Sequence, residues 1–223
     1  MGLKTIVFDF DGTLTTRNNN IWTNIWKRLD AMDVDELLYK KYYNKEIDYA
    51  EWCEKIEKEY IKRNFSLELL NDITKDMRLI DSLEETLKIL KDNGYHLYIV
   101  SGGIDVVIKR VLGNLAKYFD DIYSCKFEFD NHGKLMHIIP TKYDDEGKKW
   151  FIDEYCEKNG TKPNEITFVG NDKNDEFVHL SGCKTICLNP SHAAKHDNSE
   201  IWHNVICTQK IIDILPLLEV KKR

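Results

Sequence analysis

Two aspartates lie one residue apart directly after a short apolar run near the N-terminus. Asp9 and Asp11 belong to the segment DFDGTLT, which follows the apolar residues TIVF. Alternate residues of a β-strand project to the same side, so the two carboxylates would lie close together and repel each other. A hard cation that prefers oxygen ligands, such as Mg²⁺, is the natural partner for such a pair. Gly12 then permits the sharp turn that leads the chain away from the strand.

Three other interpretations of this segment compete with a magnesium site. An EF-hand requires glycine at the sixth position of its loop, and Gly12 is only the fourth residue from Asp9, which excludes that motif. The metal-binding Asp-x-Asp of a sugar-nucleotide transferase accounts for the carboxylates but not for the whole segment. Two ordinary surface aspartates after a strand are the remaining alternative.

Polar groups follow two further apolar runs. Ser101, Gly102 and Gly103 come after HLYIV, and the segment GNDKND at residues 170–175 comes after ITFV. A hydroxyl and backbone amides at the end of a strand can bind a phosphate. Ser-Gly turns and Asx-rich turns are also common, so neither segment decides the chemistry alone. Lys148 and Lys149 begin a predicted helix, where a lysine is usually solvated.

Short apolar runs alternate with helical patterns through most of the chain. Strands are predicted at residues 5–10, 96–100, 166–169 and 185–188, and a weaker one at 205–207. Helices are predicted from Ser82, with a capping box to Glu85, up to Gly94, and at residues 104–112 and 148–158. This alternation predicts an α/β fold with a Rossmann-like parallel sheet, whose ligands bind at the carboxyl ends of the strands.

Two segments interrupt the alternation. Residues 20–76 contain no strand pattern but show helical spacing, as in Trp52, Ile56 and Tyr60. Residues 123–139 alternate around the turn sequence DNHG, which predicts a hairpin. We therefore expect a core of residues 1–16 and 80–223 that carries the hairpin, and an inserted helical cap of residues 17–79.

Taken in order, DFDGTLT, SGG, the helix-start lysine and GNDKND resemble the motifs of the haloacid dehalogenase (HAD) superfamily. The resemblance covers nearly the whole chain, and the hairpin is similar to that of the phosphoserine-phosphatase-like branch. It implies a phosphatase that hydrolyses a small phosphomonoester with Mg²⁺ and forms a phospho-aspartate on Asp9. A phosphomutase or other phosphotransferase of the same fold, and a non-catalytic phosphate-binding regulatory module, are the alternatives.

The resemblance also assigns catalytic roles. Asp9 would be the nucleophile and a metal ligand. Asp11 would protonate the leaving alcohol, then activate water, and would give its backbone carbonyl to the metal. Ser101 would bind a phosphoryl oxygen, and a lysine would neutralise the nucleophile and the phosphate. Lys148 is preferred over Lys149 because apolar residues follow it three, four and seven positions later.

Further binding residues follow from the same resemblance. Thr13, Gly102 and Gly103 would contact the phosphate. Arg17 is a separate candidate, chosen because it lies in the loop of residues 15–20 that leads into the expected cap, and it would contact a second anionic group on the substrate. Asn171 would ligate the metal where the family has an acid, and Asp175 would support the site through the water ligands. An alternative register makes Asp172 the ligand instead of Asn171. The branch carries a glutamate where this chain has Asn18, so we do not expect a dedicated phosphoserine phosphatase.

Composition and charge exclude several classes of binding partner and indicate where the protein is located. The net charge of −6 disfavours nucleic-acid binding. No apolar run approaches the ~18 residues of a membrane span, and no signal peptide is recognisable. None of the six cysteines forms a Cys-x-x-Cys pair, so free buried thiols and a cytoplasmic location are expected. The expected partner is a small phosphorylated metabolite, and the chain is expected to be a monomer or a homodimer.

Overall fold

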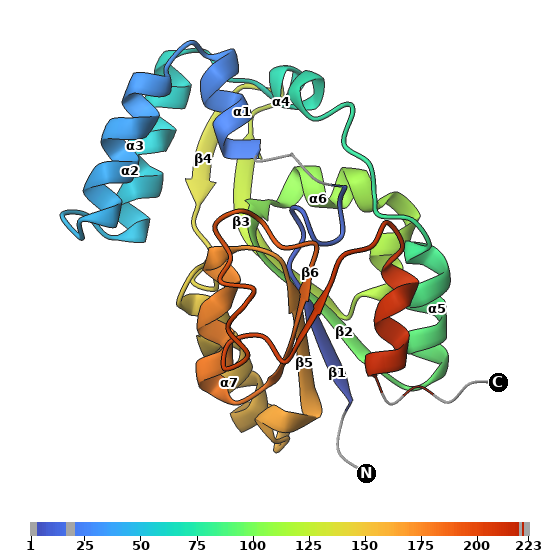
Figure 1. The fold of residues 1–223 in the computed structure, drawn as a ribbon. Helices are drawn as coiled ribbons and strands as arrows, with labels where there is room; N and C mark the ends of the chain where they lie inside the picture. The colour runs from blue at the N-terminus through green and yellow to red at the C-terminus, as the bar shows by residue number, and fades with distance from the viewer. Residues whose placement is uncertain (1–3, 17–20, 219, 221–223) are drawn as a thin grey trace.

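The predicted strands form one seven-stranded sheet in the computed structural model, which describes residues 4–16, 21–218 and 220 (Figure 1). Its strands are β1 (Thr5–Phe8), β2 (His96–Ile104), β3 (Asp121–Phe129), β4 (Leu135–Ile139), β5 (Ile166–Gly170), β6 (Lys184–Leu188) and β7 (Asn204–Ile206). The order is β4-β3-β2-β1-β5-β6-β7, and only the β3–β4 pair is antiparallel. The predicted α/β fold with a Rossmann-like core is confirmed.

Helices cover both faces of this sheet. The α-helices are α1 (Ile21–Arg28), α2 (Met32–Tyr43), α3 (Tyr49–Lys62), α4 (Leu67–Ile73), α5 (Leu83–Asp92), α6 (Asp105–Leu112) and α7 (Gly147–Asn159). Short 3-10 helices are η1 (Gly113–Tyr118), η2 (Pro163–Glu165), η3 (Lys173–Ser181) and η4 (Ile211–Leu217). Figure 1 shows α7 on one face and α5 with the C-terminal η4 on the other.

The side chains of β1 divide between two apolar clusters, one on each face. Val7 packs in the cluster that contains Phe151 and Ile152 of α7. Ile6 and Phe8 belong to the larger cluster on the opposite face. All three β1 side chains are fully buried, as expected for a central parallel strand. The strand that carries the aspartates is therefore held rigidly on both sides.

Two local predictions were wrong. Ser82 has a left-handed backbone, with φ of 61°, and its side chain does not cap α5, so the predicted capping box is absent. The hydroxyl of Thr86 instead donates to the Ser82 carbonyl, at 2.8 Å. The second error is the length of β2, which continues past Val100 to Ile104, where it pairs with Cys125 of β3. The SGG segment thus belongs to the strand.

The segment between β1 and β2 holds α1–α4, which lie together beyond one end of the sheet (Figure 1). These helices pack against the β3–β4 hairpin. Backbone bonds join Leu67 N to the Gly133 carbonyl at 2.8 Å and Leu135 N to the Phe65 carbonyl at 3.2 Å. The carboxylate of Glu57 in α3 accepts from Ile138 N of β4 at 2.6 Å. Any movement of these helices over the sheet would therefore carry the hairpin with it.

The structure also bears on the predicted burial of the cysteines and on the search for a membrane-spanning helix. All six cysteines are free, but Cys207 is exposed and Cys156 is half-buried, so the predicted burial fails for these two. Within the described ranges, no helix is long and apolar enough to cross a membrane.

Candidate active site

Asp9 and Asp11 lie where β1 leaves the centre of the sheet. Asp9 N donates to the Val169 carbonyl at 2.9 Å, which extends the β1–β5 pairing by one residue. The chain then turns tightly around the Phe10 carbonyl, which accepts from the backbone N–H of Leu14 at 2.9 Å. Gly12 has φ of 81°, and a Cβ there would collide with the side chain of Asn171. Any other residue would be strained at this φ and would displace the Asn171 side chain, so glycine lets the two loops approach closely.

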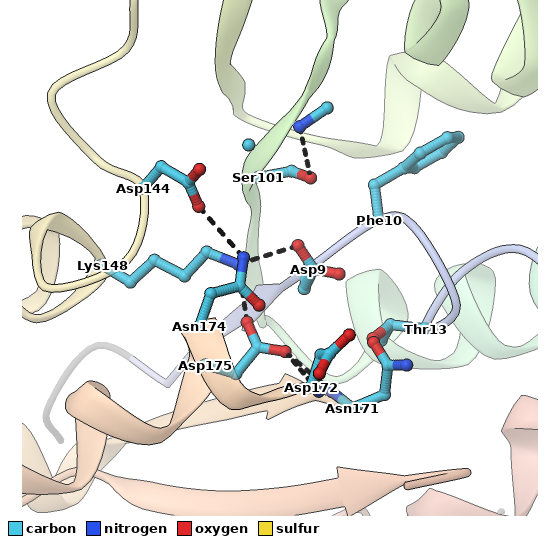
Figure 2. A network of polar contacts seen from close by, with 12 residues as sticks. Asp9, Phe10, Thr13, Ser101, Asp144, Lys148, Asn171, Asp172, Asn174 and Asp175 are labelled. Atoms are coloured by element: carbon cyan, nitrogen blue, oxygen red, sulfur yellow. Dashed lines mark hydrogen bonds and ion pairs between the residues drawn. The ribbon is translucent and has the colours of Figure 1, made fainter. Parts of the chain in front are cut away.

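A buried ammonium group joins the two acids that come from different strands. Lys148 Nζ donates to Asp9 Oδ1 at 2.9 Å and to Asp175 Oδ1 at 2.6 Å (Figure 2). The side chains of Lys148 and Asp175 are fully buried, and Asp9 is nearly so. Lys149 instead pairs with Asp153 on the surface of α7. Of the two candidate lysines, the structure therefore places Lys148 against Asp9.

The carboxylate of Asp175 also organises the loop that follows β5. Its Oδ2 accepts from the backbone N–H of Asn171 at 2.8 Å and of Asp172 at 3.0 Å. With the Lys148 bond on Oδ1, both carboxylate oxygens have protein partners. Asp175 thus fixes the GNDKND loop and orients Lys148, and its oxygens are already engaged.

The electrostatics distinguish the two aspartates after β1. Burial raises the pKa of Asp9, while the Lys148 ammonium opposes the rise. Burial raises the pKa of Asp11 well above its usual range, and the charge of Asp9 adds to the effect. Asp11 Oδ1 is buried and has no hydrogen-bond partner. Asp11 is therefore suited to hold a proton that it can give to a bound group.

The remaining predicted residues surround these aspartates. Ser101 is buried, and its hydroxyl oxygen accepts from Gly103 N at 3.1 Å. The Thr13 hydroxyl donates to Asn171 Oδ1 at 3.1 Å. Asp172 Oδ1 accepts from the Ser191 hydroxyl at 2.6 Å and from Lys173 N at 2.7 Å, and Asp172 lines the same cavity as Asn171. Arg17 lies outside the described residues.

A cavity of about 510 Å³ opens between the strand ends and the helices above them. This volume suits a small metabolite. Its core side is lined by Asp9, Asp11, Gly12, Ser101, Gly102, Gly103, Asp144, Asn171, Asp172, Asn174, Ser191 and His192. Its other wall is formed by Ile21, Trp22, Tyr49 and Trp52 of α1 and α3. Most of the predicted motif residues therefore share one cavity with the inserted helices, whereas Thr13, Lys148 and Asp175 are not part of its lining.

Residues 3–176 match the family model of the haloacid dehalogenase-like hydrolases. The chain belongs to this family. The matched range contains the four motifs around the cavity, so the HAD resemblance is confirmed at the level of the family.

Two curated relatives of this family member are phosphatases. A phosphoserine phosphatase of Archaeoglobus fulgidus is 27% identical over 176 residues, which are 78% of this chain and 49% of that protein. A phosphoglycolate phosphatase of Haemophilus influenzae is 29% identical over 113 residues, which are 50% of this chain and 45% of that protein. The matches thus span about half of the length of these relatives.

Solved structures show the same fold over a larger share of the chain. A phosphoserine phosphatase with a phospho-aspartyl intermediate analogue superposes with a TM-score of 0.72 at 21% identity, covering 98% of this chain and all of that one. A substrate-bound phosphoserine phosphatase complex gives the same TM-score at 20% identity, with the same coverage. These likenesses establish the architecture of this HAD protein, including its inserted helices.

The sequence pattern missed several cavity residues in this HAD chain. Asp144 precedes α7 and accepts from Asn174 Nδ2 at 3.1 Å. Trp22, Tyr49 and Trp52 occupy helical positions that resemble ordinary core spacing, but all three line the cavity. In the sequence, the acidic pair Asp144-Asp145 close to the motif lysine could have indicated that Asp144 belongs to the site.

The donors at the cavity suit a hard divalent ion. Asp9, Asp11 and Asn171 offer oxygen atoms there, and Asp11 Oδ1 is buried without a partner. Over the described part of the chain, no group of three or more His, Cys, Asp or Glu side chains could hold a metal. Mg²⁺ commonly takes one or two protein carboxylates, several waters and a substrate phosphate, so this smaller set fits it.

Proposed function

We propose that this HAD protein is a Mg²⁺-dependent phosphomonoesterase that works through a phospho-aspartate on Asp9. The observation that carries the proposal is the buried Lys148 ammonium, held between Asp9 and Asp175 at 2.9 and 2.6 Å. Asp11, whose buried oxygen is free, lies in the same cavity. A nucleophile beside a fixed cation and a protonated acid is the arrangement that phosphoryl transfer to a carboxylate requires.

In the first half-reaction, a carboxylate oxygen of Asp9 attacks phosphorus and the bond to the substrate oxygen breaks. Asp11 gives its proton to the departing alcohol, and its raised pKa keeps that proton available. Lys148 offsets the negative charge of Asp9 as the phosphate approaches. The Ser101 hydroxyl and the amides near Gly102, which line the cavity, would bind phosphoryl oxygens.

In the second half-reaction, the Asp11 carboxylate takes a proton from water, whose oxygen attacks the phosphorus of the acyl phosphate. The bond to Asp9 breaks, inorganic phosphate leaves, and Asp11 is protonated again. Bound Mg²⁺ would supply charge stabilisation for the phosphoryl group, held by Asp9, the Asp11 carbonyl and Asn171. Both Asp175 oxygens already have protein partners, so in place of the predicted contact to water ligands Asp175 would support the site by holding Lys148 and the loop that carries Asn171.

Hydrolysis of an aryl phosphate tests the proposal directly. We expect the purified protein to release the phenol and phosphate with Mg²⁺, and to lose this activity with EDTA. A metal-independent protein that binds phosphate without turnover would be a regulatory module. Retention of phosphate on an acceptor alcohol, rather than release to water, would instead indicate a phosphotransferase.

Asp11→Asn is expected to separate the two half-reactions. With an alkyl phosphate, kcat should fall by about 10²–10⁴-fold, because the alcohol leaves without a proton donor. An aryl leaving group needs no proton, so the acyl phosphate should still form and then accumulate. An acid quench of the variant with radiolabelled aryl phosphate should trap more labelled protein than the wild type. If the variant traps no label and is equally slow on both substrates, Asp11 is not the acid and base.

Asn171→Asp is expected to tighten Mg²⁺ binding by roughly tenfold, because it adds a negative charge among the oxygen donors. Asn171 faces the nucleophile loop through Thr13, whereas Asp172 is held by Ser191. Asp172→Asn, which keeps this bond, should change Mg²⁺ affinity little. Titration of Tm and of activity with Mg²⁺ measures both variants. Weaker Mg²⁺ binding in Asp172→Asn, with no change in Asn171→Asp, would make Asp172 the ligand.

A further inference from the structure

The cavity wall opposite the catalytic aspartates is aromatic. The Trp52 ring lies 5.6 Å from Trp22 and 5.7 Å from Tyr49, between ring centroids. Tyr42 packs behind them, 5.7 Å from Trp52 and 6.1 Å from Tyr49. Trp22, Tyr49 and Trp52 themselves line the cavity. The alcohol part of a bound phosphomonoester would therefore meet these aromatic rings.

An acid lies beside this wall. A Cβ on Gly102 would collide with the carboxylate of Asp144, and Trp22 Nε1 donates to the Gly102 carbonyl at 3.0 Å. The two side chains therefore meet at the same glycine. Burial raises the pKa of Tyr49, and the negative charge of Asp144 raises it further. Asp144 thus lies between the aromatic wall and the end of the cavity where the phosphate would bind.

The Asp144 carboxylate is available to a bound cation. Asp144 Oδ1 accepts from Asn174 Nδ2 at 3.1 Å and from Asp145 N at 2.9 Å. Its charge helps to raise the pKa of Lys148, but within residues 4–16, 21–218 and 220 Asp144 makes no direct ion pair. A carboxylate without a direct ion-pair partner, next to aromatic side chains that line the same cavity, is complementary to a positively charged group with an apolar surface.

We propose that Asp144, Trp22, Tyr49 and Trp52 bind an alkylated ammonium group on the leaving alcohol. The substrate class is then a phosphomonoester of a short amino alcohol, and this inference rests on the proposed phosphatase function. Aromatic faces attract such cations, and methyl groups on nitrogen pack against the rings without needing hydrogen bonds. The carboxylate supplies the charge complement at one edge of the pocket.

The same pocket disfavours an anionic leaving group. Asp144 and Asp172 both line the cavity in addition to the two catalytic aspartates. A carboxylate on the alcohol would approach these like charges. This repulsion would disfavour phosphoglycolate and phosphoserine, whose alcohols carry a carboxylate and which the names of the curated relatives mention.

Two substrates of matched shape test the proposal. Choline phosphate carries trimethylammonium, and neohexyl phosphate carries a neutral tert-butyl group in its place. The ratio of their kcat/KM values is measured with Mg²⁺ for the wild type and each variant. The change in this ratio between variants cancels the different reactivity of the two leaving alcohols and any effect on the chemical step.

Asp144→Asn is expected to lower the ratio by roughly tenfold or more. Asp145→Asn is the matched control, because it removes one charge from the same loop at a side chain that bonds Tyr42 and does not line the cavity. It should change the ratio less than about twofold. Trp52→Leu should lower the ratio roughly fivefold, and Trp52→Phe, which keeps an aromatic face, should restore most of it.

An unchanged ratio in Asp144→Asn, or an equal fall in Asp144→Asn and Asp145→Asn, overturns the proposal. So does a wild-type preference for phosphoserine or phosphoglycolate over choline phosphate. In these cases aryl phosphate hydrolysis continues, and only the substrate class is wrong. Absence of aryl phosphate hydrolysis by the wild type overturns the proposed function and, with it, this inference. Asp144→Asn keeps the shape of the side chain, so it still tests the proposal if the Trp52 variants fail to fold.

Discussion

Asp9→Asn is expected to lower kcat by about 10³-fold or more and to leave no acid-stable phosphate on the protein. The amide is a poor nucleophile and cannot form the acyl phosphate. The fold should persist, because Lys148 keeps its 2.6 Å bond to Asp175 and β1 remains buried between two clusters. Aryl phosphate turnover, acid-quench labelling and circular dichroism measure these three outcomes.

Asp153→Asn is a suitable control for this variant. Asp153 lies on the surface of α7, where it pairs with Lys149, and its loss should change neither turnover nor labelling. A tenth or more of wild-type activity in Asp9→Asn would show that Asp9 is not the nucleophile. Persistent labelling would place the phosphate on another side chain of the cavity.

The sheet and the four motifs could be predicted because each rests on local sequence. Runs such as TIVF are almost continuously apolar, as is typical of strands covered on both faces, and polar residues follow each run directly. In a parallel sheet, strand ends of this kind meet at one edge. The pattern of apolar runs and polar ends is therefore enough to predict that Asp9, Ser101 and the GNDKND loop lie near one another.

The missing parts depend on contacts between distant segments. β2 extends to Ile104 because Cys125 of β3 pairs with it, which no pattern within HLYIVSGG reveals. Trp22 and Trp52 have the spacing of core residues, and only the packing of α1 and α3 over the strand ends turns them toward the cavity. Ser82 adopts φ of 61°, so its hydroxyl does not reach the N–H groups that a capping box would satisfy.

Asp175→Ala is expected to lower the free energy of unfolding by about 3–5 kcal/mol, as loss of one partner from a buried ion pair does. The substitution leaves Lys148 with Asp9 alone and removes the acceptor of two backbone N–H groups in the GNDKND loop. Chemical denaturation measures the change. Turnover should also fall, because the loop that carries Asn171 loses its anchor.

A double-mutant cycle with Lys148→Met separates the ion pair from the loop anchor. Lys148→Met leaves two buried carboxylates without their cation, so it should also cost several kcal/mol. If the ammonium and Asp175 act as one unit, the double variant should be less destabilised than the sum of the single variants. The exposed pair of Lys149 and Asp153 gives the matched cycle on the same helix, with a coupling of about 0.2–1 kcal/mol at most. Additive losses for the buried pair would mean that Asp175 stabilises the loop alone, and that Lys148 is held in place by Asp9.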